Sequence, residues 1–265
     1  MNHPVLELRD VSVRYGTPTA PHTLALDAAT LSVAPGECVG IAGGPGSGTT
    51  TLLLCASGLI GADAGSVRWF GSHRWHAGRA AYESASADGH PYLSVRAWLE
   101  FSASQREDDA LGPEPDVEAV MSLASLCEFA RIRVGHLTPG VSARVALAGA
   151  LLGTPRIVMF DRPFDALSCA ERARLAQVLG SVLSAGVAVV VTTRVASLLG
   201  DLSPSRIHYL AGGRLDLQPP SMQPWNSTCR CRSRRARDSP CVCQACTGAG
   251  ARSAFRLSDS RPNRY

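Results

Sequence analysis

The feature that most constrains the fold is an apolar segment followed at once by a glycine-rich loop and a helical pattern. The apolar segment covers residues 38–42 (CVGIA), the loop covers 43–51 (GGPGSGTTT), and the helical pattern covers 50–59. An apolar run bounded by turn residues is typical of a buried strand. Glycines let successive backbone N–H groups point at an anion, and the start of a helix adds positive potential. This unit predicts either a phosphate-binding loop or a purely structural turn.

Strand-like and helix-like segments alternate along the rest of the chain. Apolar runs predict further strands at 67–70, 157–160 and 187–191. Helical periodicity is present at 95–101, 117–126, 142–152 and 170–183. Alternating or hairpin-like patterns occur at 5–15, 24–33 and 207–217, whereas 72–89 is polar and irregular. This order predicts an α/β fold with a mainly parallel sheet covered on both faces and antiparallel strands towards both ends of the domain.

Composition favours an ordinary soluble domain. The 265 residues are 45% hydrophobic and 18% charged, and no apolar run approaches the roughly 20 residues of a membrane helix. No basic and then apolar leader begins the chain, so we expect a cytoplasmic protein. All 26 basic residues are arginine, which matters because a phosphate-binding loop normally carries a lysine.

The segment 219–265 differs from the rest. It is rich in Pro, Ser, Arg and Cys and lacks periodicity, so we expect it to be disordered. Five of the nine cysteines lie there, in pairs that suggest zinc but fit no familiar zinc pattern. Its arginines could contact acidic lipid or nucleic acid, although we expect no nucleic-acid partner. The other four cysteines are expected to be small buried hydrophobes: Cys38, Cys55, Cys127 and Cys169.

Residues 6–217 resemble the ATP-binding domain of ABC transporters, motif after motif and in order. The matching segments are the loop at 43–51, the start of a helical subdomain at 93–101, the signature at 137–155, the Walker B strand and D-loop at 157–168, and the switch strand at 187–194. The resemblance implies a P-loop NTPase fold over 1–218, with an antiparallel N-terminal β subdomain and an inserted α-helical subdomain at about 85–150.

The resemblance also implies a site, cofactors and partners. The nucleotide-binding positions would be Tyr15, which would stack on adenine, and Gly43, Gly46, Ser47, Gly48, Thr49, Thr50 and Thr51. The signature positions would be Leu137, Thr138 and Gly140, and Mg²⁺ would be held with the nucleotide by Thr50 and Asp161. The expected cofactors are ATP and Mg²⁺. The expected partners are a second ATP-binding domain, in a homodimer or heterodimer, and a membrane permease that would hold the chain at the inner face of the membrane.

Several positions depart from the family pattern. Thr49 replaces the lysine that reaches the phosphates, and a charged hydrogen bond contributes about 1.5–3 kcal/mol. The Q-loop glutamine aligns with Ala85, and the switch histidine with Thr193. In the signature, Pro139 removes a backbone N–H and Val141 replaces a glutamine.

Arg162 occupies the position of the catalytic glutamate. A general base contributes about 10²–10⁴-fold to a rate, and an arginine cannot accept a proton from water at neutral pH. Arg162 could contact a phosphate and partly replace the missing lysine, or it could form a salt bridge with Asp161 or Asp165.

Two functions remain open. The chain could be the ATP-binding subunit of an ABC transporter that binds nucleotide but hydrolyses it poorly, or only with a partner. Alternatively, it could be a regulatory or scaffold protein that uses the ABC fold for partner binding alone. Because no family catalytic residue is intact, the sequence leaves enzymatic activity undecided.

Overall fold

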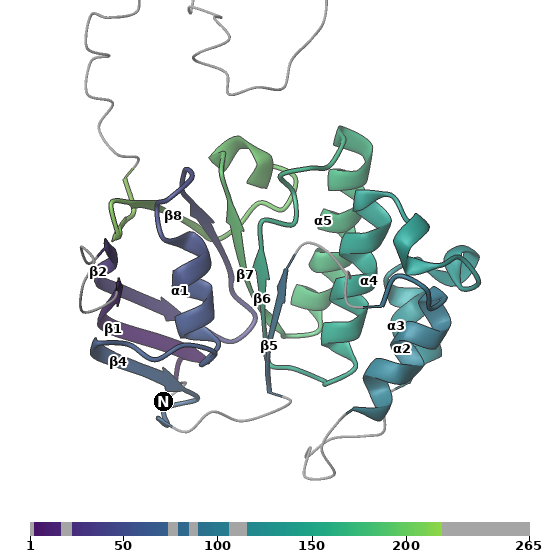
Figure 1. Cartoon of the computed structure of the whole chain (residues 1–265), viewed down its shortest axis with the longest axis horizontal. Helices are drawn as coiled ribbons and strands as arrows, with labels where there is room; N and C mark the ends of the chain where they lie inside the picture. The colour runs from purple at the N-terminus through teal and green to yellow at the C-terminus, as the bar shows by residue number, and fades with distance from the viewer. Residues whose placement is uncertain (1–2, 17–22, 74–78, 85–89, 106–115, 219–265) are drawn as a thin grey trace, which may run out of the picture. The chain divides into compact units, whose positions relative to one another are not determined.

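The computed structural model describes residues 3–16, 23–73, 79–84, 90–105 and 116–218 (Figure 1). These residues belong to one compact unit, Met1–Ser221. The predictions for Ala85 and for the segment 219–265 fall outside the described residues. Within the described ranges, no helix is both long enough and apolar enough to cross a membrane.

The central sheet has six strands in the described part of the chain, in the order β5-β6-β7-β3-β8-β9. Their bounds are β3 (Cys38–Ala42), β5 (Ala80–Ser84), β6 (Ile157–Asp161), β7 (Ala188–Thr193), β8 (Arg206–Ala211) and β9 (Arg214–Asp216). Neighbouring strands run parallel except β8 and β9, which form the predicted antiparallel hairpin. The mainly parallel sheet expected from the sequence is therefore confirmed.

A second, antiparallel sheet has the order β2-β1-β4. Its strands are β1 (Leu6–Tyr15), β2 (Thr23–Val33) and β4 (Ala64–Trp69). Helix α1 (Thr49–Ala56) lies between this sheet and the central one and contacts strands of both (Figure 1). Leu52 and Leu53 of α1 are fully buried there, so one apolar core joins the antiparallel sheet, α1 and one face of the central sheet.

A second core covers the opposite face of the central sheet. The remaining helices are α2 (Val95–Ser104), α3 (Val117–Leu123), α4 (Pro139–Leu151) and α5 (Cys169–Ser184), with short 3₁₀ turns at Cys127–Phe129, Val134–His136 and Ala196–Leu199. Helices α4 and α5 lie beside the sheet, and α2 and α3 pack farther out (Figure 1). Along β6, Val158 and Phe160 enter this second core, whereas Ile157 and Met159 enter the first. This alternation explains why the strand is apolar throughout.

Two expectations were wrong in detail. The polar, irregular segment 72–89 contains β5, which among the described strands has a sheet neighbour on one side only, so its side chains need not be uniformly apolar. Cys38 and Cys55 are buried as expected, but Cys127 and Cys169 are exposed. Cys127 begins a 3₁₀ turn, and Cys169 begins α5 directly after its capping residue. Both lie at helix ends, where fewer neighbours cover a side chain.

Candidate functional site

The glycine-rich loop (residues 43–51) connects the fully buried strand β3 to α1. Gly48 precedes the helix with φ 102°, a left-handed conformation that glycine adopts without strain. A Cβ atom at Gly48 would collide with the carbonyl oxygen of Ala25, and one at Gly43 would crowd Ser47 and a backbone carbonyl. A Cβ atom at Gly46 would meet nothing. The loop is therefore packed on its inner side and open on its outer side.

The start of α1 has no side-chain cap and lies beside a buried hydroxyl that has no partner among the described residues. Helix α1 has no side-chain N-cap and no acidic residue in its first turn. The first N–H groups of a helix need partners from outside the helix. The hydroxyl of Ser47 is buried and has no hydrogen-bond partner among the described residues. An uncapped helix start with a buried unpartnered hydroxyl fits the phosphates of a nucleotide.

The three threonines that follow Gly48 have different surroundings. Thr49, at the lysine position, is buried, so its short side chain cannot replace the reach or charge of a lysine. Thr51 Oγ1 donates a 3.4 Å hydrogen bond to the phenol oxygen of Tyr15. Tyr15 is 46% exposed, so an aromatic face beside the loop is open to solvent. The structure places Tyr15 next to the loop, and its stacking on adenine stays a prediction.

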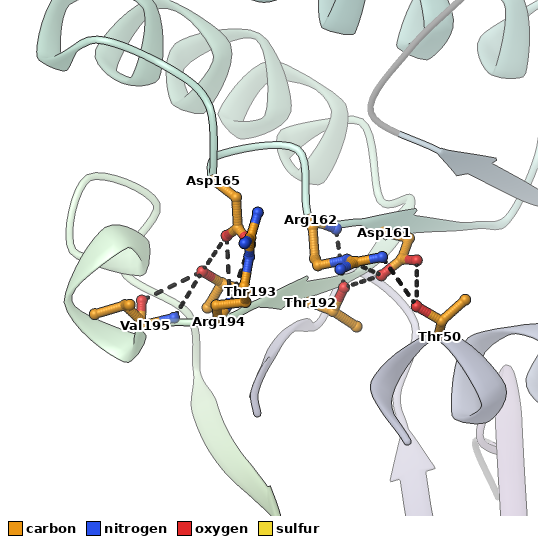
Figure 2. A network of polar contacts seen from close by, with 8 residues as sticks. All are labelled: Thr50, Asp161, Arg162, Asp165, Thr192, Thr193, Arg194 and Val195. Carbon is orange, nitrogen blue, oxygen red and sulfur yellow. Dashed lines mark hydrogen bonds and ion pairs between the residues drawn. The ribbon is translucent and has the colours of Figure 1, made fainter. Parts of the chain in front are cut away.

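Thr50 joins the loop to the end of β6 (Figure 2). Its Oγ1 donates a 2.8 Å hydrogen bond to Oδ2 of Asp161, whose side chain is only 6% exposed. The other carboxylate oxygen of Asp161 accepts a 2.5 Å hydrogen bond from Thr192 Oγ1 at the end of β7. The carboxylate therefore has a hydroxyl partner on each oxygen, which offsets the cost of burying its charge.

Arg162 lies against the same carboxylate (Figure 2). Its Nε is 3.6 Å from Asp161 Oδ1, and its Nη2 donates a 3.3 Å hydrogen bond to Thr50 Oγ1. The backbone of Arg162 has φ 52°, a left-handed conformation that is uncommon for residues other than glycine. Its backbone N–H donates a hydrogen bond to Thr192 Oγ1. The predicted salt bridge with Asp161 is confirmed, and the predicted phosphate contact stays a prediction.

A second polar network surrounds Asp165 in the D-loop (Figure 2). Thr193 Oγ1, at the switch histidine position, donates to Asp165 Oδ1 at 2.7 Å. Arg194 Nε donates to Asp165 Oδ2 at 2.7 Å. The Asp165 side chain is 6% exposed and the Arg194 side chain 52%. The Thr193 hydroxyl is therefore hydrogen-bonded within this chain, whereas the family has a titratable imidazole at this position.

The signature segment lies at the start of α4. Thr138 caps the helix by accepting a 3.4 Å hydrogen bond from the N–H of Val141. The N–H of Gly140 donates at 3.3 Å to Oε1 of Glu171, from the first turn of α5. Glu171 also forms a capping box with Ser168. Hydrogen bonds from Ser168, and then from Thr138 and Gly140, lower the pKa of Glu171.

Sequence reasoning missed Glu171. The signal was present, because Ser168 and Glu171 have the spacing of a capping box. That spacing predicts the local contact between them, but not the contact with Gly140 on another helix. The structure therefore brings Tyr15, Thr50, Asp161 and the loop together, while Thr138 and Gly140 start a helix on the other face of the central sheet (Figure 1).

The oxygen ligands expected for Mg²⁺ do not fit that ion as they are arranged. Thr50 and Asp161 are adjacent, which suits a cation. However, the guanidinium of Arg162 already contacts both of them. The loop thus fits phosphate better than the neighbouring residues fit a metal.

Comparison with known proteins agrees with this geometry. The family model described as "ABC transporter" matches residues 26–165. A putative ABC transporter ATP-binding protein of Halobacterium salinarum is 31% identical over 199 residues, covering 71% of this chain and 82% of that protein. The taurine import ATP-binding protein TauB of Jannaschia sp. (strain CCS1) is 27% identical over 172 residues, covering 64% of each. The match thus spans less than two thirds of that relative's length.

A solved structure gives the same fold. The structure of cbiO1 from Clostridium perfringens, described as part of an ABC transporter complex, superposes with a TM-score of 0.69 at 19% identity. The alignment covers 82% of this chain and 88% of that one. The fold and site define a P-loop nucleotide-binding domain with a parallel central sheet. The chain belongs to the ABC transporter ATP-binding family.

Proposed function

We propose that this chain is the ATP-binding subunit of an ABC transporter, and that it binds nucleotide but does not hydrolyse it unaided. The observation that carries the proposal is the contrast between the open loop and the residue that follows Asp161. The loop keeps an uncapped helix start and a buried Ser47 hydroxyl without a partner in the described part of the chain. Arg162 stands at the general-base position with its guanidinium against a carboxylate. Such a site can hold a triphosphate but has no group to activate water.

The same contrast supports a paired arrangement. In ABC domains, as the resemblance implies, each nucleotide lies between the loop of one domain and the signature of the other. A site built on this chain's loop would not turn over. A site built on an intact partner's loop would use Thr138 and Gly140 of this chain. We therefore propose that hydrolysis requires a partner domain, and that a membrane permease holds the pair at the membrane.

Steady-state hydrolysis tests the proposal. The purified chain alone should bind ATP and show no hydrolysis above that of a Gly48→Ala control, because no general base is in place. Robust turnover that disappears in Asp161→Asn would contradict the proposal. Nucleotide binding itself is measured by quenching of a fluorescent ATP analogue, which should weaken when Tyr15 is changed to Ala.

The alternative is a regulatory or scaffold protein that does not bind nucleotide. The internal use of the Thr193 hydroxyl and of the Gly140 N–H favours it, because the resemblance implies that the family directs its switch histidine and its signature towards nucleotide. The two functions differ in one measurement. Failure to bind at millimolar ATP would favour the scaffold, and measurable affinity would favour the ATP-binding subunit.

A further inference from the structure

The guanidinium of Arg162 contacts the same hydroxyl and carboxylate that, as the resemblance implies, would hold the metal ion with the nucleotide. Thr50 Oγ1 accepts a 3.3 Å hydrogen bond from Nη2, and Asp161 Oδ1 lies 3.6 Å from Nε. Both contacts come from the side chain at the catalytic glutamate position. One cation therefore already neutralises the buried carboxylate that Mg²⁺ would need.

The substitutions at the loop and at Arg162 also change the charge of the site. Thr49 in place of lysine removes one positive charge beside the phosphates. Arg162 in place of glutamate replaces a negative charge with a positive one. The site is one positive charge richer than the family pattern, although its lysine is gone. Its attraction for an anion has moved from the loop to the end of β6.

The remaining donors of Arg162 are available to a ligand. A guanidinium carries five N–H donors, and its contacts with Thr50 and Asp161 involve two of its nitrogens. The side chain is 42% exposed, so part of the fork faces solvent beside the open side of the loop. Guanidinium groups match phosphate oxygens in a bidentate geometry, which an ammonium group does not provide.

A divalent ion would be disfavoured at the same place. Mg²⁺ requires near-octahedral oxygen ligands and keeps several of its waters. A guanidinium that contacts both protein oxygens occupies that space and repels a second cation. Thr50 also donates its hydroxyl proton to Asp161 and accepts from Arg162, so its oxygen is engaged on both sides.

We propose that Arg162 takes the place of Mg²⁺ in this chain, so that the site binds the phosphates of a nucleoside triphosphate without a divalent metal. The inference rests on the proposed function, since it presumes that nucleotide binds at the glycine-rich loop. It names Arg162 as the phosphate-binding cation and assigns Asp161 the role of positioning it.

Calorimetric titration with ATP, in Mg²⁺ and separately in EDTA, tests the inference on the full chain. The wild-type affinity should change by less than about threefold between the two buffers. Arg162→Asn should lower the affinity in EDTA by about tenfold or more, since a hydrogen bond to a charged group is lost. The variant should also acquire a dependence on Mg²⁺, because Thr50 and Asp161 become free to hold the ion.

The variants separate binding from folding. Asn tolerates the left-handed backbone found at Arg162, so Arg162→Asn should keep the wild-type melting temperature to within a few degrees. Arg162→Lys retains the charge but not the bidentate fork, so it should recover only part of the metal-free affinity. Arg9→Ala removes an exposed arginine that pairs with Glu7 on β1, and should change nothing.

Three results would overturn the inference. Binding by the wild type only in Mg²⁺ would reject it and leave the proposed function standing. Equal metal-free affinity of wild type and Arg162→Asn would also reject the inference and leave the proposed function standing. Absence of binding in both buffers would reject the proposed function, and the inference with it.

Discussion

Two helix starts in this chain occupy positions that bind phosphate in the ABC family, and they differ in whether the chain already satisfies them. Helix α1 begins without a side-chain cap and next to the Ser47 hydroxyl, which no described residue hydrogen-bonds. Helix α4 begins with a threonine cap, a proline and a carboxylate from α5. Because an anion binds where N–H groups lack partners, the comparison indicates that the loop side is open and the signature side is largely closed.

The starts of α1 and α4 also depart from the family pattern in different ways. At α1 the charges have been rearranged, but the backbone that would cradle phosphate is intact. At α4 the backbone itself has changed, since Pro139 has no N–H and the N–H of Gly140 is used by Glu171. A subunit of this kind would contribute more to the nucleotide on its own loop than to the nucleotide on a partner's loop.

The largest effect is expected from Gly48→Ala. The new Cβ would meet the carbonyl oxygen of Ala25, and the left-handed backbone would cost about 1–3 kcal/mol in addition. Nucleotide affinity should fall by at least about thirtyfold, since a cost of 2 kcal/mol corresponds to roughly that factor. Titration with ATP measures the loss. Gly61→Ala, where a Cβ meets nothing, is the matched control, and equal losses in both variants would show that the loop is not the binding site.

The next effect, a dependence of folding stability on pH, is expected at β5. Burial raises the pKa of Glu83, on β5 beside β6, to about 7. Between about pH 4.5 and 7 the folded state holds a proton that the unfolded state has lost, so stability should fall as pH rises through this range. The loss should be about 2 kcal/mol, given about 1.4 kcal/mol per pKa unit and some remaining contact with water.

Urea denaturation at pH 5 and pH 8 measures this change. Glu83→Gln removes the titrating group and should flatten the difference between the two pH values. The control is Glu100→Gln, because the Glu100 side chain on α2 is exposed. This variant should keep the wild-type difference in stability between the two pH values. If Glu83→Gln behaves like that control, Glu83 is not the group responsible.

The smallest effect is expected on the signature side. Glu171→Ala removes the capping box and the contact with Gly140, and should destabilise the fold by about 1 kcal/mol. The pKa of Glu171 is lowered, so its contribution is present at neutral pH and is lost as pH falls through the folded-state value. The difference from wild type should therefore shrink in acid, which is opposite to the trend for Glu83.

This last variant also tests the comparison directly. ATP affinity of the isolated chain should be unchanged in Glu171→Ala if the nucleotide binds only at the α1 side. A change as large as that of Gly48→Ala would mean that the two helix starts act on one ligand within a single chain, and the contrast drawn between them would fail.

The sequence by itself determined the strand–loop–helix unit, the order of the elements, and which residue stands at each family position. These features depend on local periodicity, turn residues and spacing, which a single chain displays directly. The sequence also carried the capping-box spacing of Ser168 and Glu171. It did not reveal strand β5, because an edge strand with polar residues has no distinct apolar pattern.

Only the tertiary structure decided where the charged side chains go. Thr50 and Asp161 are 111 residues apart, and their contact depends on how β3 and β6 lie in one sheet with β7 between them. The choice of Asp161 rather than Asp165 as the partner of Arg162, and of Glu171 as the partner of Gly140, follows from that packing. A buried charge must be paired, but the sequence does not say with which of several nearby groups, because the pairing depends on distances that exist only once the sheet has formed.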